Sequence, residues 1–197
     1  MDIYLLRHGE TNSNKDNKFY GSLDTPLNDI GKSQIINIRP HLSKVKFDVV
    51  YSSTLQRAKE SVALLGEDIY EKNIADKRLD ELSFGKFEGL SYNEILSRYP
   101  KEAIKWEKDW KGYTPPKGES YIDFYNRVRE CFKEILKTEA DNVLVATHMG
   151  VIKSIFCYVL GEDLDLFWKL TAHNGKYSVI KYEYNNLFID CINKGDI

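Results

Sequence analysis

Leu5-Leu6-Arg7-His8-Gly9-Glu10-Thr11 is the stretch that decides the fold of this chain. The apolar residues 3–6 predict a short buried strand, and the run ends abruptly at a cation, an imidazole and a glycine. Open α/β sheets bind ligands beyond the carboxyl ends of their strands, so Arg7 and His8 are predicted to lie in a site. A neutral imidazole can attack phosphorus, and the planar fork of a guanidinium matches phosphate oxygens. An isolated Arg-His pair could equally end a strand in solvent, but the rest of the chain favours a site.

A second strand is predicted to end in the same way. Residues 142–147 form the clearest apolar strand pattern and run into His148, Met149 and Gly150, before an apolar helix over residues 151–160. Because this strand also delivers an imidazole at its carboxyl end, we expect both strands to supply one site.

The order of the predicted elements indicates the fold class. Strands alternate with helices, which is typical of βαβ units. We therefore expect an α/β fold: a three-layer α/β/α sandwich with a mainly parallel central sheet. Residues 1–197 should form a single domain, with a small helical lid insertion over residues 84–120.

Individual elements follow from local patterns. A polar, turn-rich loop is expected over residues 12–27, and Ser52-Ser53-Thr54 is a candidate N-cap. Further predicted helices cover residues 29–42, 55–65, 91–99, 101–110 and 120–137. Further predicted strands cover residues 47–51, a short edge strand at 69–74, and a closing hairpin at 177–184 and 187–192.

Composition excludes several classes of function. The net charge of −2 gives no general basic surface, so nucleic-acid binding is not expected. No apolar run is long enough to span a bilayer, and no basic leader opens the sequence, which favours a cytoplasmic location away from membranes. The 4 histidines and 3 cysteines lack metal-ligand spacing, so neither a metal nor another cofactor is expected.

Arg57 is a further candidate for anion binding. It follows the strand over residues 47–51 and falls in the first turn of the next helix, where free backbone N–H groups and the helix dipole already favour an anion. The alternative interpretation is an ordinary ion pair with Glu60 or another surface carboxylate.

These stretches together resemble the histidine phosphatase superfamily, the phosphoglycerate-mutase-like proteins. The opening Arg7-His8-Gly9-Glu10-Thr11 with Asn14 resembles the family signature, and four further landmarks follow in order. They are Phe19 to Leu27 with Gly31 and Gln34, then Tyr51 to Ala58, Arg78 to Gly89, and Thr147 to Ile152. The chain departs from the family at Ser61, where Thr is common, and at Met149, where Gly is usual.

The resemblance implies roles for the polar residues. His8 would attack phosphorus and become a phosphohistidine, and Glu81 would act first as general acid and then as general base. Asp80 and Glu88 are nearby carboxylates that could be mistaken for this acid. The groups that would hold the phosphoryl oxygens are Arg7, Asn14, Arg57 and His148. Two arginines and an imidazolium would balance a phosphate dianion without a metal.

A narrower resemblance concerns the lid. Phe84-Gly85-Lys86-Phe87-Glu88-Gly89 and Pro115-Pro116-Lys117-Gly118-Glu119-Ser120 are similar to α-ribazole phosphatases of cobalamin synthesis, which usually have Gly where this chain has Lys117. This likeness implies α-ribazole 5′-phosphate as substrate, whose flat benzimidazole would suit an aromatic lid. The candidate substrate contacts are Tyr20, Gly21, Trp106, Trp110 and Tyr113.

Three alternatives stay open. They are a broad-specificity phosphatase of sugar phosphates or 3-phosphoglycerate, a phosphoglycerate mutase, and a non-catalytic phosphate-binding module. The short chain favours a phosphatase over a mutase, because a mutase must exclude water from its phosphohistidine. The expected partner is a small-molecule phosphomonoester, and the hydrophobic lid and edge strands are compatible with a homodimer.

Overall fold

The computed structural model describes residues 1–15 and 18–195. A six-stranded sheet lies at its centre, in the order β3-β2-β4-β1-β5-β6. The strands are β1 (Asp2–Arg7), β2 (Val49–Ser52), β3 (Asn73–Ala75), β4 (Asn142–Thr147), β5 (Tyr177–Glu183) and β6 (Asn186–Lys194). The first four strands of the order pair in parallel, while β5 and β6 are antiparallel to their neighbours. The prediction of a mainly parallel sheet is confirmed.

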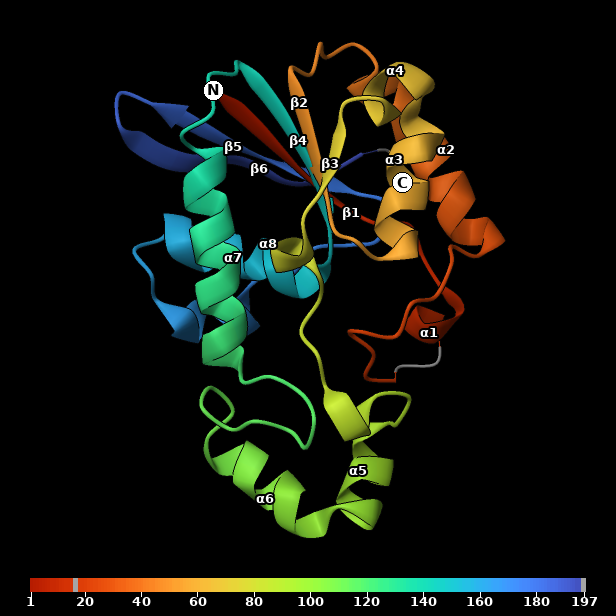
Figure 1. Cartoon of the computed structure of the whole chain (residues 1–197), viewed down its shortest axis with the longest axis vertical. Coiled ribbons are helices and arrows are strands. Elements are labelled where there is room, and N and C mark those ends of the chain that lie inside the picture. The colour runs from red at the N-terminus through yellow and green to blue at the C-terminus, as the bar shows by residue number, and fades with distance from the viewer. Residues whose placement is uncertain (16–17, 196–197) are drawn as a thin grey trace.

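Helices cover both faces of this sheet and make three layers (Figure 1). One face packs against α7 (Tyr121–Ile135) and α8 (Met149–Val159), and the other against α2 (Asp29–Leu42) and α3 (Gln56–Leu65). Alternate side chains of a strand point to opposite faces, so Leu5 belongs to the first core and Leu6 to the second. Burial on both faces explains why the apolar runs of β1 and β4 have no polar alternation.

A small group of helices lies beyond one end of the sheet (Figure 1). It comprises the 3₁₀ helix η2 (Gly85–Phe87), α5 (Tyr92–Arg98) and α6 (Pro100–Lys108). These helices have a core of their own, made by Phe87, Ile95 and Ala103. The residues that were predicted as a lid therefore pack mainly against one another.

The remaining short elements lie in the connections. They are α1 (Asn12–Lys15), α4 (Glu67–Tyr70) and the 3₁₀ helices η1 (Lys77–Leu79) and η3 (Leu164–Lys169). The expected edge strand over residues 69–74 was wrong at its start, because α4 extends to Tyr70 and β3 holds only three residues.

The predicted N-cap of α3 was also wrong. Leu55 occupies the cap position without a side-chain cap, because the hydroxyls of Ser53 and Thr54 donate instead to the Asp80 carboxylate. Ser120, by contrast, caps α7, since its hydroxyl accepts from the backbone N–H of Asp123.

The register of β1 with β4 positions the two histidines. Arg7 pairs with Thr147, so His8 and His148 leave the sheet at the same height. The backbone N–H of His8 continues the ladder by donating to the carbonyl of Thr147 over 3.0 Å. The two imidazole ring centroids consequently lie 5.1 Å apart.

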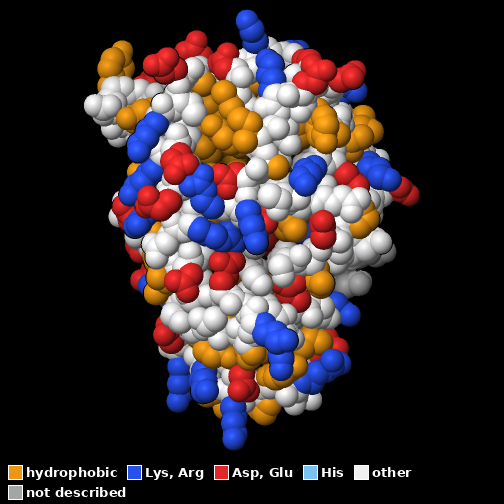
Figure 2. Space-filling view, in the orientation of Figure 1, with side chains coloured by type: hydrophobic (Ala, Val, Ile, Leu, Met, Phe, Trp, Pro, Cys, Tyr) orange, Lys and Arg blue, Asp and Glu red, His pale blue; other side chains and the backbone are white. Residues whose placement is uncertain are grey.

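Positive and negative side chains are interspersed on the face shown in Figure 2, without a large field of one sign. Within the part of the chain that the structure describes, no helix is both long and apolar enough to cross a membrane.

Candidate active site

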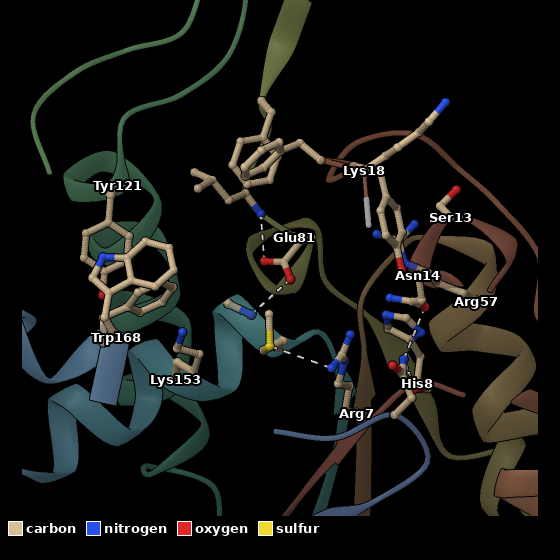
Figure 3. A pocket seen from close by; sticks show the side chains of 18 of the residues that line it. Arg7, His8, Ser13, Asn14, Lys18, Arg57, Glu81, Tyr121, Lys153 and Trp168 are labelled. Atoms are coloured by element: carbon tan, nitrogen blue, oxygen red, sulfur yellow. Dashed lines mark hydrogen bonds between the residues drawn. The ribbon is translucent and has the colours of Figure 1, made fainter. Parts of the chain in front are cut away.

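A cavity of about 480 Å³ opens between the carboxyl ends of β1 and β4 and the lid helices. Its polar lining includes Arg7, His8, Asn14, Arg57 and Glu81 (Figure 3). Its aromatic lining consists of Phe19, Tyr20, Phe84, Trp106, Trp110, Tyr121, Phe167 and Trp168. The cavity thus joins a polar end at the sheet to largely aromatic walls.

The ring of His8 is held in one orientation. Its Nδ1 donates to the carbonyl of Gly9 over 2.7 Å, because a carbonyl oxygen can only accept. The lone pair is therefore left on Nε2. Only 2% of His8 is exposed, and this burial, with the charges of Arg57 and Arg7, holds its pKa well below 6.5. His8 is a neutral imidazole with one unprotonated nitrogen, which is the state a nucleophile requires.

Arg57 is fully buried and every part of its guanidinium is bonded. One terminal nitrogen donates to the carbonyl of Leu23 and the other to that of Gly21, each over 2.8 Å, while Nε donates to Nδ1 of His148. Glu60 accepts instead from Gln56 and from a backbone N–H, so it does not form the alternative ion pair. Arg57 lines the cavity and also holds the loop before α2 through its hydrogen bonds to that loop's carbonyl groups.

His148 is connected to a carboxylate through one hydroxyl. Its Nε2 lies 2.8 Å from Ser53 Oγ, which in turn donates to Asp80 Oδ1 over 2.7 Å. His148 and Ser53 are both fully buried. Burial, followed by the charge of Arg57, lowers the pKa of His148, so the ring is neutral in the free protein.

One guanidinium nitrogen of Arg7 is hydrogen-bonded, and another has no partner among the described residues. Nη1 donates to the carbonyl of Ala172 over 2.7 Å and lies 3.7 Å from the sulfur of Met149. Nε of Arg7 is buried and has no hydrogen-bond partner among the described residues. Met149 therefore contacts the guanidinium directly, at the position where the family usually has glycine.

The three candidate carboxylates lie in different places. Glu81 lines the cavity, and its oxygens accept from the backbone N–H groups of Leu82 and Gly150, each over 3.0 Å. Asp80 faces Ser53 and Thr54, away from the cavity lining. Glu88 accepts from the backbone N–H groups of Ser22, Leu23 and Phe84, and so fastens two loops together. The geometry selects Glu81 as the carboxyl that can reach a ligand.

Comparison with known proteins agrees with this arrangement. The family model described as histidine phosphatase superfamily (branch 1) matches residues 3–195. This chain belongs to that superfamily. Phosphoserine phosphatase 1 of Hydrogenobacter thermophilus is 31% identical over 93% of this chain and 87% of its own length. The adenosylcobalamin/alpha-ribazole phosphatase of Escherichia coli K12 is 29% identical over 91% of this chain and 89% of its own length.

Solved structures show the same fold. The alpha-ribazole phosphatase from Shigella flexneri has a TM-score of 0.93 at 27% identity, covering 98% of this chain and 96% of that one. A mycobacterial glucosyl-3-phosphoglycerate phosphatase has a TM-score of 0.85 at 26% identity, covering 98% of this chain and 99% of that one. Histidine phosphatases that differ in substrate thus share this architecture.

The neutral residues predicted for the phosphatase site lie as follows. Asn14 lines the cavity, and its Oδ1 accepts from the backbone N–H of Thr11 and from Asn174. Its Nδ2 has no acceptor among the residues described here, so it is available as a neutral donor. The ring of Tyr20 lies 5.0 Å from the guanidinium carbon of Arg57 and lines the cavity.

The other candidate substrate contacts, Gly21 and the lid aromatics, lie in different places. Trp106 and Trp110 line the cavity. Tyr113 instead packs against the core of the lid helices and is absent from the cavity lining. Gly21 contributes its carbonyl to Arg57, and a Cβ there would lie only 1.7 Å from the carbonyl oxygen of Leu82.

Sequence reasoning missed several residues of this histidine phosphatase pocket. They include Lys153 on α8, Asn174, and the aromatic pair Phe167 and Trp168 on η3. A lysine within the apolar residues 151–160 was the one signal that could have found the first of them. Within residues 1–15 and 18–195, no group of three or more His, Cys, Asp or Glu could hold a metal ion.

Proposed function

We propose that this chain hydrolyses small phosphate monoesters through a phosphohistidine at Nε2 of His8. The observation that carries the proposal is the orientation of His8, whose Nδ1 proton is held by Gly9 and whose Nε2 keeps its lone pair beside Arg7 and Arg57. Such a neutral nucleophile between cations is suited to phosphoryl transfer.

Two steps complete the reaction. In the first, Nε2 of His8 forms a bond to phosphorus, the ester P–O bond breaks, and Glu81 gives its proton to the leaving oxygen. In the second, the Glu81 carboxylate takes a proton from water, the resulting hydroxide attacks phosphorus, and the P–N bond breaks to release inorganic phosphate. Arg7, Arg57 and His148 stabilise the charge on the phosphoryl oxygens in both steps.

We further propose α-ribazole 5′-phosphate as the substrate. Aromatic side chains from both sides of the cavity, among them Phe84 and Trp106, offer flat surfaces for a benzimidazole ring. The similarity to alpha-ribazole phosphatases in sequence and in fold supports this choice.

Phosphate release from a substrate panel in the presence of EDTA tests both proposals. The panel contains α-ribazole 5′-phosphate, 3-phosphoglycerate, a sugar phosphate and a nucleoside monophosphate. The expected result is metal-independent turnover with a strong preference for α-ribazole 5′-phosphate, abolished in His8→Ala and retained in the matched His173→Ala. Equal rates across the panel would indicate a broad-specificity phosphatase. Full activity of His8→Ala would overturn the mechanism.

Conversion of 3-phosphoglycerate to 2-phosphoglycerate would indicate a mutase, and binding without turnover would indicate a phosphate-binding module.

A further inference from the structure

Lys153 is a buried cation without an anionic partner. It lies on α8 with 4% of its surface exposed, and it lines the same cavity as His8. Among the described residues, no hydrogen-bond acceptor or ion-pair partner contacts its ammonium group. Its neighbours are aromatic: Nζ lies 4.0 Å from the ring centroid of Phe167 and 4.6 Å from that of Trp168.

This environment leaves the charge of Lys153 incompletely compensated. Cation–π contacts stabilise the ammonium group, but they provide no counter-charge. Burial lowers the pKa of Lys153 to about 8, although the charge of Glu81 acts in the opposite direction. The Glu81 carboxylate accepts two backbone N–H groups, and among the described residues no ion pair joins it to the ammonium.

The position of Lys153 relative to the nucleophile indicates what it could bind. In Figure 3 it lies beside Trp168 and Tyr121, on the opposite side of the cavity from His8 and Asn14, with Glu81 between. A phosphate held at His8 would therefore direct its leaving group past Glu81 and toward Lys153.

We propose that Lys153 is a second anion-binding point in this cavity, which takes a carboxylate or similar acidic group on the leaving group of a phosphate ester. The inference rests on the proposed hydrolysis at His8, because the phosphate must occupy the His8 end. It does not depend on the choice of α-ribazole 5′-phosphate, whose leaving group carries no acidic group. It extends that function to acidic phosphomonoesters, which an entirely aromatic cavity would not favour. A hydrogen bond between charged groups typically contributes about 1.5–3 kcal/mol, which corresponds to roughly 10- to 150-fold in kcat/KM.

A matched pair of substrates tests the proposal. 3-Phosphoglycerate and glycerol 3-phosphate share a three-carbon skeleton and differ in one group, a carboxylate against a hydroxymethyl. The wild type should prefer 3-phosphoglycerate, and Lys153→Met should reduce that preference at least 10-fold while leaving glycerol 3-phosphate nearly unchanged. Lys153→Arg, which keeps the charge, should retain part of the preference for 3-phosphoglycerate. Lys111→Met is the control, because Lys111 also contacts an aromatic ring, that of Trp110, but does not line the cavity.

Binding to the His8→Ala background separates the two proposals. Calorimetric titration with the same two compounds needs no turnover, and it should show the same Lys153-dependent preference. Absence of hydrolysis by the wild type, with this Lys153-dependent binding preference intact, would overturn the proposed function alone. An unchanged ratio in Lys153→Met, in both kinetics and binding, would overturn the role of Lys153.

Discussion

Nε of Arg57 donates to Nδ1 of His148 over 3.2 Å, so the ring proton of His148 must lie on Nε2. That proton is accepted by Ser53 Oγ, whose own hydroxyl donates to Asp80. Nδ1 can donate to a phosphate oxygen only after His148 takes up a second proton and Arg57 Nε no longer donates to this atom. Binding of phosphate and protonation of His148 are therefore coupled through this buried chain.

Ser53→Ala should weaken the binding of inorganic phosphate by about 10-fold or more. The substitution removes the acceptor of the Nε2 proton, which stabilises the imidazolium more than the neutral ring, and a hydrogen bond to a charged group contributes about 1.5–3 kcal/mol. Competitive inhibition constants for phosphate measure the effect, with the exposed Ser33→Ala as control. Equal inhibition constants for wild type and Ser53→Ala would contradict the coupling.

Glu81→Gln should separate the two chemical steps. With an alkyl phosphate, kcat should fall by about 10²- to 10⁴-fold, because the leaving alkoxide requires a proton. With p-nitrophenyl phosphate, whose leaving group needs no acid, the variant should release a burst of one p-nitrophenol per site and then stall as phosphohistidine. Glu88→Gln should change kcat by the same factor for both substrates. A Glu81→Gln variant that shows no burst would exclude Glu81 as the base of the second step.

Gly150→Ala should lower activity without lowering stability. A Cβ at this position would lie 2.3 Å from Oε1 of Glu81, so the carboxylate has to move. Alanine is intrinsically more favourable than glycine in a helix by about 1 kcal/mol, which offsets the strain of this shift. Thermal unfolding and kcat on one preparation measure both effects. Unaltered kcat would mean that the position of the Glu81 carboxylate is not critical.

Lys117→Gly should stabilise the protein by up to about 1 kcal/mol. Lys117 has a φ of 64°, in the left-handed region that glycine adopts without strain, and related phosphatases usually have glycine there. The same change at Lys105, inside α6, should instead destabilise by about 0.5–1 kcal/mol. Chemical denaturation compares the two variants. A destabilised Lys117→Gly would show that the lysine side chain itself stabilises the loop.

The preference for acidic leaving groups should disappear as the pH rises through 8. Lys153 has a pKa of about 8 and is charged below it, so the anion-binding point is present at pH 6.5 and lost by pH 9.5. The groups acting on it are Glu81 and Cys157, which favour the charged form, and Arg7, which opposes it. The ratio of kcat/KM for 3-phosphoglycerate and glycerol 3-phosphate cancels the shared phosphate ionisation. A ratio that is constant with pH would contradict this assignment.

The sequence predicted the features of the fold that depend on a local pattern of apolar residues. The apolar runs ending at His8 and His148 indicated two buried strands and a site at their ends, and the sheet register places both rings together. The walls of the cavity depend instead on tertiary packing. Trp110 and Tyr113 are three residues apart in one loop region, yet only Trp110 lines the cavity. Likewise, no local pattern shows that η3 brings Phe167 and Trp168 against Lys153.

The strand order has a consequence for biosynthesis. β1 lies between β4 and β5, whose residues are translated more than 130 positions later. The ribosome therefore makes the strand that leads into the nucleophile well before its pairing partners. Until then an apolar strand has no neighbours in the nascent chain, and such long-range pairing is intrinsically slow. The strand that leads into His8 can complete its pairing only after residues 142–183 have been made.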